Sequence, residues 1–111
     1  MKNLLRLRPL AFLLLLALAA CQLPGTQATY GGGDGLSPAT AVVVQGVGDE
    51  RAGIRAEYAW IAQHFPGSKP KAQHLSSFGG KPQDAIVIVT VAGNETTVYF
   101  DISAFFGKLG N

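Results

Sequence analysis

Apolar positions in the middle of this 111-residue chain change from the pattern of a strand to that of a helix. Residues 40–47, TAVVVQGV, are rich in β-branched side chains, and that composition predicts a strand. Asp49 then has the side chain that a helix N-cap requires, and Pro66 with Gly67 predicts the end of the helix. Between them, large apolar residues recur at spacings of four, three and four, which predicts one buried helix face. These residues are Ile54, Tyr58, Ile61 and Phe65.

Two β-rich segments near the C-terminus predict a hairpin. Residues 84–92, DAIVIVTVA, and 95–103, ETTVYFDIS, are joined by a Gly-Asn pair, which is typical of tight two-residue turns. If Ala92 lies opposite Glu95, one face is uniformly apolar and is expected to be core. Its pairs are Val89–Val98, Val87–Phe100 and Ala85–Ile102. The other face is mixed and pairs Ile88 with Tyr99, Thr90 with Thr97, and Ile86 with Asp101.

The order of these elements predicts the fold class. Residues 71–78, KAQHLSSF, add a weaker strand between the helix and the hairpin. The resulting order, β-α-β-β-β, predicts an α+β domain over residues 40–111, with an antiparallel four-stranded sheet packed on one amphipathic helix. This order of elements is similar to that of cystatin-like and PepSY-like small modules, although no sequence motif of either accompanies it.

The first twenty-one residues have the pattern of a targeting segment. Three basic residues within positions 1–8 precede an uncharged run at 9–20, PLAFLLLLALAA. This run is shorter than the roughly 20 apolar residues of a membrane-spanning helix, and its length and positive flank are typical of a signal peptide. The run ends in Leu18-Ala19-Ala20-Cys21, which resembles the lipobox of bacterial lipoproteins.

The lipobox resemblance implies a lipid anchor. It implies that a signal peptide, residues 1–20, is cut off before Cys21 and that Cys21 carries diacylglycerol and an amide-linked acyl chain such as palmitate. Two or more acyl chains hold a protein stably at a membrane. Gln22 follows, not the Asp that favours inner-membrane retention in this family. The resemblance therefore implies a location at the outer membrane, facing the periplasm.

Residues 21–39 are rich in Gly, Thr, Ser and Pro and have no apolar periodicity, so we expect a flexible linker there. The segment contains GGGDG, residues 31–35. A phosphate-binding loop would need a preceding strand and a following helix with Lys-Ser/Thr, and a calcium loop would need carboxylates beside Asp34. Neither pattern is present.

The charge of the chain excludes a nucleic-acid partner. Of nine Lys and Arg residues, three lie in positions 1–8, which leaves six against seven Asp and Glu from Gln22 onward. Nucleic-acid recognition depends on clustered basic residues, and this nearly neutral segment has none. Cys21 is the only cysteine, so no disulfide within the chain is expected. We expect no cofactor and no metal, with His64 and His74 as surface side chains.

Trp60 is the aromatic residue with the clearest hint of function. On a helical wheel it lies about 120° away from the expected core face, beside small residues. It is expected either to be covered by Phe105 and Phe106 or to be presented to a partner. The candidate partner-binding residues are Trp60 and the mixed hairpin face: Ile86, Ile88 and Tyr99.

These patterns predict a non-enzymatic envelope lipoprotein. Its small domain is expected to bind another protein, a wall component or a second copy of the chain. The alternative is a periplasmic inhibitor or modulator of an enzyme, which the cystatin-like order implies. A small hydrolase or metal-binding protein that uses His64 or His74 is the third interpretation.

Overall fold

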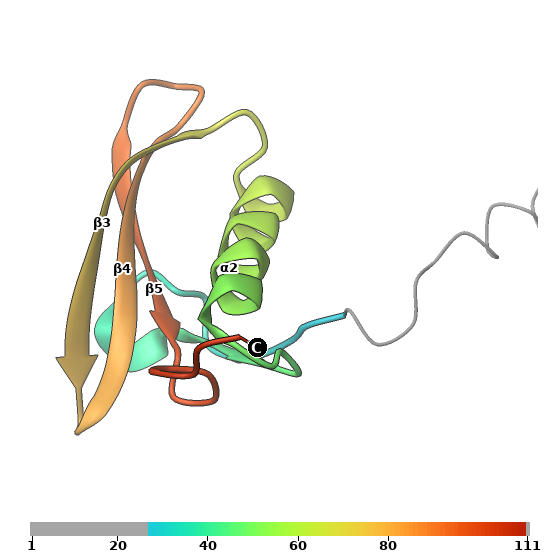
Figure 1. The fold of residues 1–111 in the computed structure, drawn as a ribbon. Coiled ribbons are helices and arrows are strands. Elements are labelled where there is room, and N and C mark those ends of the chain that lie inside the picture. The colour runs from blue at the N-terminus through green and yellow to red at the C-terminus, as the bar shows by residue number, and fades with distance from the viewer. Residues whose placement is uncertain (1–26, 111) are drawn as a thin grey trace, which may run out of the picture.

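The computed structural model describes residues 27–110, which form one α+β domain. One helix, α2 (Glu50–His64), packs on one face of a five-stranded mixed sheet (Figure 1). The strands in spatial order are β1 (Thr29–Gly32), β2 (Val42–Gln45), β5 (Glu95–Asp101), β4 (Lys81–Val89) and β3 (Lys69–Phe78). A 3-10 helix, η2 (Pro38–Thr40), precedes β2.

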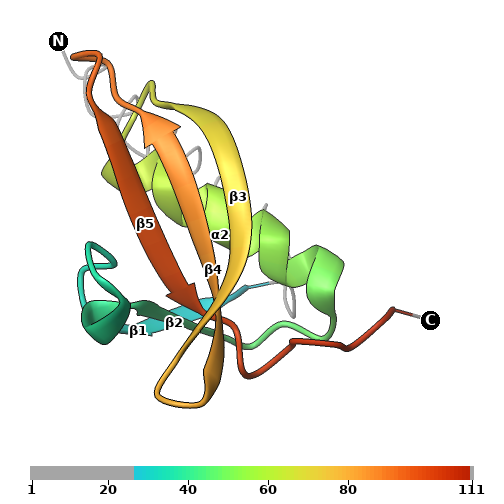
Figure 2. The same ribbon diagram turned by 90° about the vertical axis from the view of Figure 1, so that its left-hand side faces the viewer.

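The sheet is mixed, not wholly antiparallel, and has five strands, not four. β2 pairs in parallel with β5, through Val42–Phe100 and Val43–Asp101, and all other pairs are antiparallel. Figure 2 shows α2 behind β3, β4 and β5, while β1 and β2 join the sheet where β5 ends. The α+β class is confirmed. The expected topology is wrong at the edge formed by β1 and β2, where the sheet has an additional strand and a parallel pair.

The extra strand comes from the segment that was expected to be a linker. β1 is followed by a sharp return in which Gly33 N–H donates to the Ala41 carbonyl at 3.1 Å. A side chain on Gly33 would collide with the backbone of Thr40, so only glycine permits this approach. Asp34 Oδ1 accepts hydrogen bonds from Leu36 N–H (3.0 Å) and the Thr40 hydroxyl (2.9 Å). GGGDG thus comprises the end of β1 and the start of the turn toward β2, and a flexible segment that extends to residue 39 is wrong.

Helix α2 begins and ends as predicted but buries a different face. Asp49 is the N-cap, with its Oδ1 accepting from Ala52 N–H at 2.8 Å, and the helix ends before Pro66. Ile54 is largely exposed, whereas Trp60 is buried. The full set of buried helix positions is Gly53, Ala56, Glu57, Trp60 and Ile61. Small residues on this face let the helix approach its neighbours closely, and this packing outweighs the hydrophobic spacing that had favoured the other face.

The predicted register of the β4–β5 hairpin is wrong by three residues. Val89 lies opposite Glu95 and Ile86 opposite Val98. The turn spans residues 90–94, with Thr90 N–H donating to the Asn94 carbonyl at 2.9 Å, so it is longer than a two-residue link. Because side chains alternate along a strand, an odd shift exchanges the two faces of β4. Ile86 and Ile88 therefore face α2, and Val87 and Val89 face outward.

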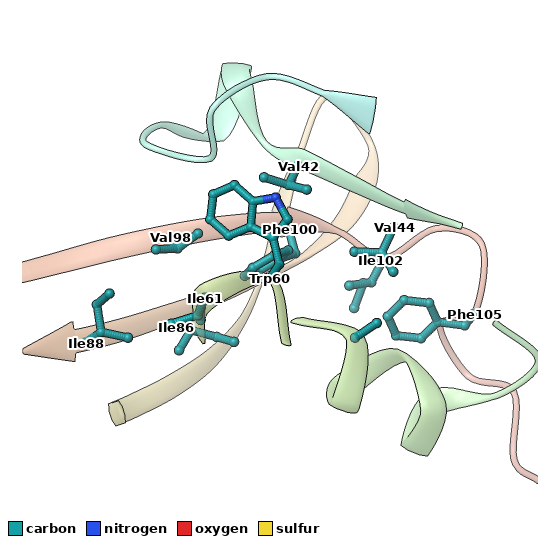
Figure 3. Packing of buried hydrophobic residues seen from close by; sticks show 11 residues of the cluster. Val42, Val44, Trp60, Ile61, Ile86, Ile88, Val98, Phe100, Ile102 and Phe105 are labelled. Atoms are coloured by element: carbon teal, nitrogen blue, oxygen red, sulfur yellow. The ribbon is translucent and has the colours of Figure 1, made fainter. Parts of the chain in front are cut away.

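The core lies between α2 and the inner face of the sheet (Figure 3). Phe100 meets Trp60 edge to face, with ring centroids 5.6 Å apart. Phe105, from the segment after β5, lies against Gly53 at the other end of the helix. The remaining large members of the cluster are Val42, Val44, Ile61, Ile86, Ile88, Val98 and Ile102.

Candidate functional site

The candidate residues from the sequence do not form one surface. Ile86 and Ile88 are completely buried, and Trp60 is 7% exposed. Tyr99 is half-buried on the opposite face of the sheet, where it lies across from Ala85. The proposed exposed face of Ile86, Ile88 and Tyr99 is therefore wrong, because the register shift turns both isoleucines into the core. Cys21 lies outside the described residues.

Trp60 is held by its own helix and by the sheet, not by Phe105 and Phe106. The His64 ring stacks on Trp60 with centroids 3.8 Å apart, and its Nδ1 is 2.9 Å from the Trp60 carbonyl oxygen. Phe65 and Phe100 are the other aromatic neighbours. His64 thus has a structural contact, while His74 is exposed on β3. Within residues 27–110, no three His, Cys, Asp or Glu side chains gather into a set that could hold a metal ion.

A small cavity opens at the N-terminal half of α2 and brings together residues that are far apart in the sequence. Its volume is about 190 Å³. Its exposed rim is apolar and consists of Ile54 (38% exposed), Leu75 (64%) and Phe106 (46%). Its buried wall consists of Asp84, Ile102 and Phe105, while the exposed Gln73 and the half-buried Glu50 complete the lining. We call this feature the acidic cavity.

The C-terminal segment is tied to the start of the helix and so forms one wall of the acidic cavity. Gly107 N–H donates to Glu50 Oε2 at 2.6 Å. Glu50 N–H in turn donates to the Lys108 carbonyl at 2.9 Å. These two bonds fix Phe105 and Phe106 over the first turns of α2.

A buried carboxyl, Glu57, neighbours Asp84 but does not itself line the acidic cavity. Glu57 has no exposed surface, and neither of its carboxyl oxygens has a hydrogen-bond partner among the described residues. Burial raises the pKa of Glu57 to about 10, and the neighbouring Asp84 carboxyl contributes to that rise. Glu57 is therefore a neutral acid at pH 7.

Asp84 is only weakly satisfied by its neighbours. Gln73 Nε2 donates to Asp84 Oδ2 at 3.4 Å, a long hydrogen bond. The Tyr58 hydroxyl donates to Gln73 Oε1 at 3.0 Å and so orients the amide. No Lys, Arg or His of residues 27–110 lines the cavity. The cavity is therefore an acidic hollow with an apolar mouth.

The sequence contained a faint signal for this site. Glu57 stands among Gly53, Ala56 and Trp60, and a charged residue within a face of small and aromatic side chains signals a buried carboxyl. Asp84 directly precedes the apolar run of β4. Without the correct buried face of the helix, however, nothing indicated that Glu57 and Asp84 meet.

Among residues 27–110, no helix combines the length and hydrophobicity that a membrane crossing requires. The chain matches no protein-family model, no curated protein and no solved structure.

Proposed function

We propose that this chain is an envelope lipoprotein, anchored through Cys21, whose domain is a non-catalytic module that binds a partner protein at the mouth of the acidic cavity. The observation that carries the binding role is the rim of Ile54, Leu75 and Phe106, three exposed large apolar side chains around one hollow. Exposed apolar clusters on soluble domains commonly mark interaction surfaces.

The size of the acidic cavity favours a protein partner over a free small molecule. Pockets for drug-sized ligands measure roughly 300–1,000 Å³, and this cavity has about 190 Å³. A hollow of that size suits one inserted side chain. Central anchor residues that enter pockets, surrounded by apolar contacts that exclude water, are the usual anatomy of interface hot spots.

The anchoring role is supported by the lipobox resemblance of residues 18–21. β1 begins at Thr29, so no more than a few residues separate Cys21 from the domain. A lipid at Cys21 would hold the domain close to the membrane surface. The same reasoning favours a partner that is itself at the membrane or in the layer next to it.

Photo-crosslinking in native membranes tests this function. A photoreactive amino acid replaces Leu75 or Phe106 in the full chain, and in a matched control it replaces Val91, which is 77% exposed but lies in the β4–β5 turn. Figure 1 shows this turn at the end of the sheet remote from the start of α2. We expect a discrete protein adduct from positions 75 and 106 but not from 91.

Dependence on the rim makes this result specific. The adduct from position 75 or 106 should disappear when the same chain also carries Ile54→Asp. It should persist when the chain carries Val91→Asp instead. Equal adducts from all three positions, or an adduct that is indifferent to Ile54→Asp, would exclude the acidic cavity as the binding surface.

A further inference from the structure

The chemistry of the acidic cavity specifies what kind of side chain it would accept. Glu57 and Asp84 bring two carboxyl groups together, and both side chains are almost completely buried. Burying polar groups without hydrogen-bond partners is costly. Such groups are rare in native proteins and tend to mark functional sites or bound species.

The unsatisfied groups in this region are carboxyl groups, so acceptors predominate among their open positions. Both oxygens of Glu57 lack a partner in the described part of the chain, and Asp84 accepts one long bond from Gln73. Glu50, which also lines the cavity, is negatively charged, and no basic side chain lines it. An incoming group that complements this wall must therefore supply donors and positive charge.

The rim sets a second requirement. A group that reaches Asp84 from solvent must pass Ile54, Leu75 and Phe106, which are apolar. A side chain with a charged head on an aliphatic stem meets both requirements. Its stem packs on the apolar rim while its head pairs with the carboxylate.

We infer that the acidic cavity receives a lysine or arginine side chain of the partner protein, with its cationic head on Asp84 and its methylene stem against Ile54, Leu75 and Phe106. This inference rests on the proposed binding function and specifies the partner's chemistry. Glu57, a neutral acid beside Asp84, has carboxyl oxygens without partners among the described residues, and its carbonyl oxygen would accept a hydrogen bond from the incoming head.

Short peptides of defined charge test the inference on the full chain in detergent. The probes are Gly-Gly-Lys-Gly-Gly, its Arg analogue and its norleucine analogue, which keeps the aliphatic stem without the charge. Chemical-shift changes are followed at the Gln73 side-chain amide and the Leu75 backbone amide. We expect saturable shifts with the Lys or Arg peptide only, with binding at least about tenfold weaker in Asp84→Asn.

The unaltered chain provides a test that does not depend on whether Asp84→Asn folds. Raising the salt from 50 to 500 mM should weaken the Lys or Arg peptide several-fold, because part of the attraction is between charges. Equal shifts with the norleucine peptide, or the absence of saturable shifts with every peptide, would overturn the inference.

The two proposals fail in different ways. If the crosslinked adduct from Leu75 persists undiminished in Asp84→Asn, the binding function stands and the cationic side chain is wrong. If no adduct forms at Leu75 or Phe106, the proposed binding of a partner protein at this surface is wrong, irrespective of the peptide results.

Discussion

Gly53 is the residue on which the fit of the C-terminal segment depends. The ring of Phe105 occupies the space where a β-carbon on Gly53 would lie. Glycine costs a helix about 1 kcal/mol relative to alanine, so helix propensity alone would favour a substitution at this position. Close packing of the ring against the helix backbone explains why a helix interior carries a glycine here.

We therefore expect Gly53→Ala to destabilise the domain by about 1–3 kcal/mol, because overpacking outweighs the gain in helix propensity. Urea unfolding followed by circular dichroism measures the change. Phe105→Leu replaces the ring that fills this space with a smaller side chain. The double variant Gly53→Ala/Phe105→Leu should therefore recover part of the lost stability. A gain in stability for Gly53→Ala would contradict the placement of Phe105.

At the scale of elements, the sequence predicted where the helix and the hairpin strands lie but not how they face the core. Asp49 and the Pro-Gly pair mark the helix ends by local chemistry, and both predictions are confirmed. The buried face is decided by tertiary packing, which placed Glu57 inside and Ile54 outside. β1 was missed because its Thr-Tyr-Gly-Gly sequence has almost no β-branched character and depends on pairing with β2.

The hairpin register provides a prediction at the same scale. Ile88→Asp should unfold the domain, because it buries an unpaired carboxylate at a position with no exposure, at a cost of several kcal/mol. Val87→Asp, one residue earlier on the outer face, should leave the fold intact. Dispersion of amide signals in two-dimensional NMR distinguishes the outcomes. If the two variants behaved in the opposite way, the register over β4 would be wrong.

At the scale of the whole molecule, the acidic cavity could not be foreseen from the sequence. It is assembled from α2, β3, β4 and the segment after β5, so it depends on the register and on the buried helix face together. If the predicted register or the predicted buried helix face is wrong, Glu57 and Asp84 are not expected to lie near each other. The predicted targeting segment is the opposite case, because its sequence signal is wholly local and the prediction can be tested without the fold.

Anchoring at Cys21 gives a prediction for the molecule in its membrane. Cys21→Ser should abolish incorporation of an alkyne-labelled fatty acid and leave the chain unprocessed at residue 20. The unaltered chain should take up the label and remain with the membrane after a high-salt wash. An unlabelled wild-type chain, with membrane association unchanged by Cys21→Ser, would remove the lipoprotein interpretation and leave the binding surface untouched.

Asp84 in the wall of the acidic cavity has a neutral, completely buried Glu57 beside it. The pKa of Glu57 rises from 4.5 to about 10 on folding, so between these values the folded chain holds one proton more than the unfolded chain. The stability that this proton confers is complete below pH 4.5 and is lost as the pH rises through about 10. The groups that face Glu57, Asp84 from β4 and Tyr58 beside it, remain the same in a Glu57→Gln variant.

The most direct test is the free energy of unfolding of the full chain, measured at pH 5, 6.5 and 8 for the wild type and for Glu57→Gln. The wild type should lose up to about 1.4 kcal/mol for each pH unit relative to the variant, because only the wild type must release this proton on unfolding. Parallel stability curves for the two chains would mean that Glu57 is ionised or exposed in the folded protein, and would contradict the acidic cavity as described.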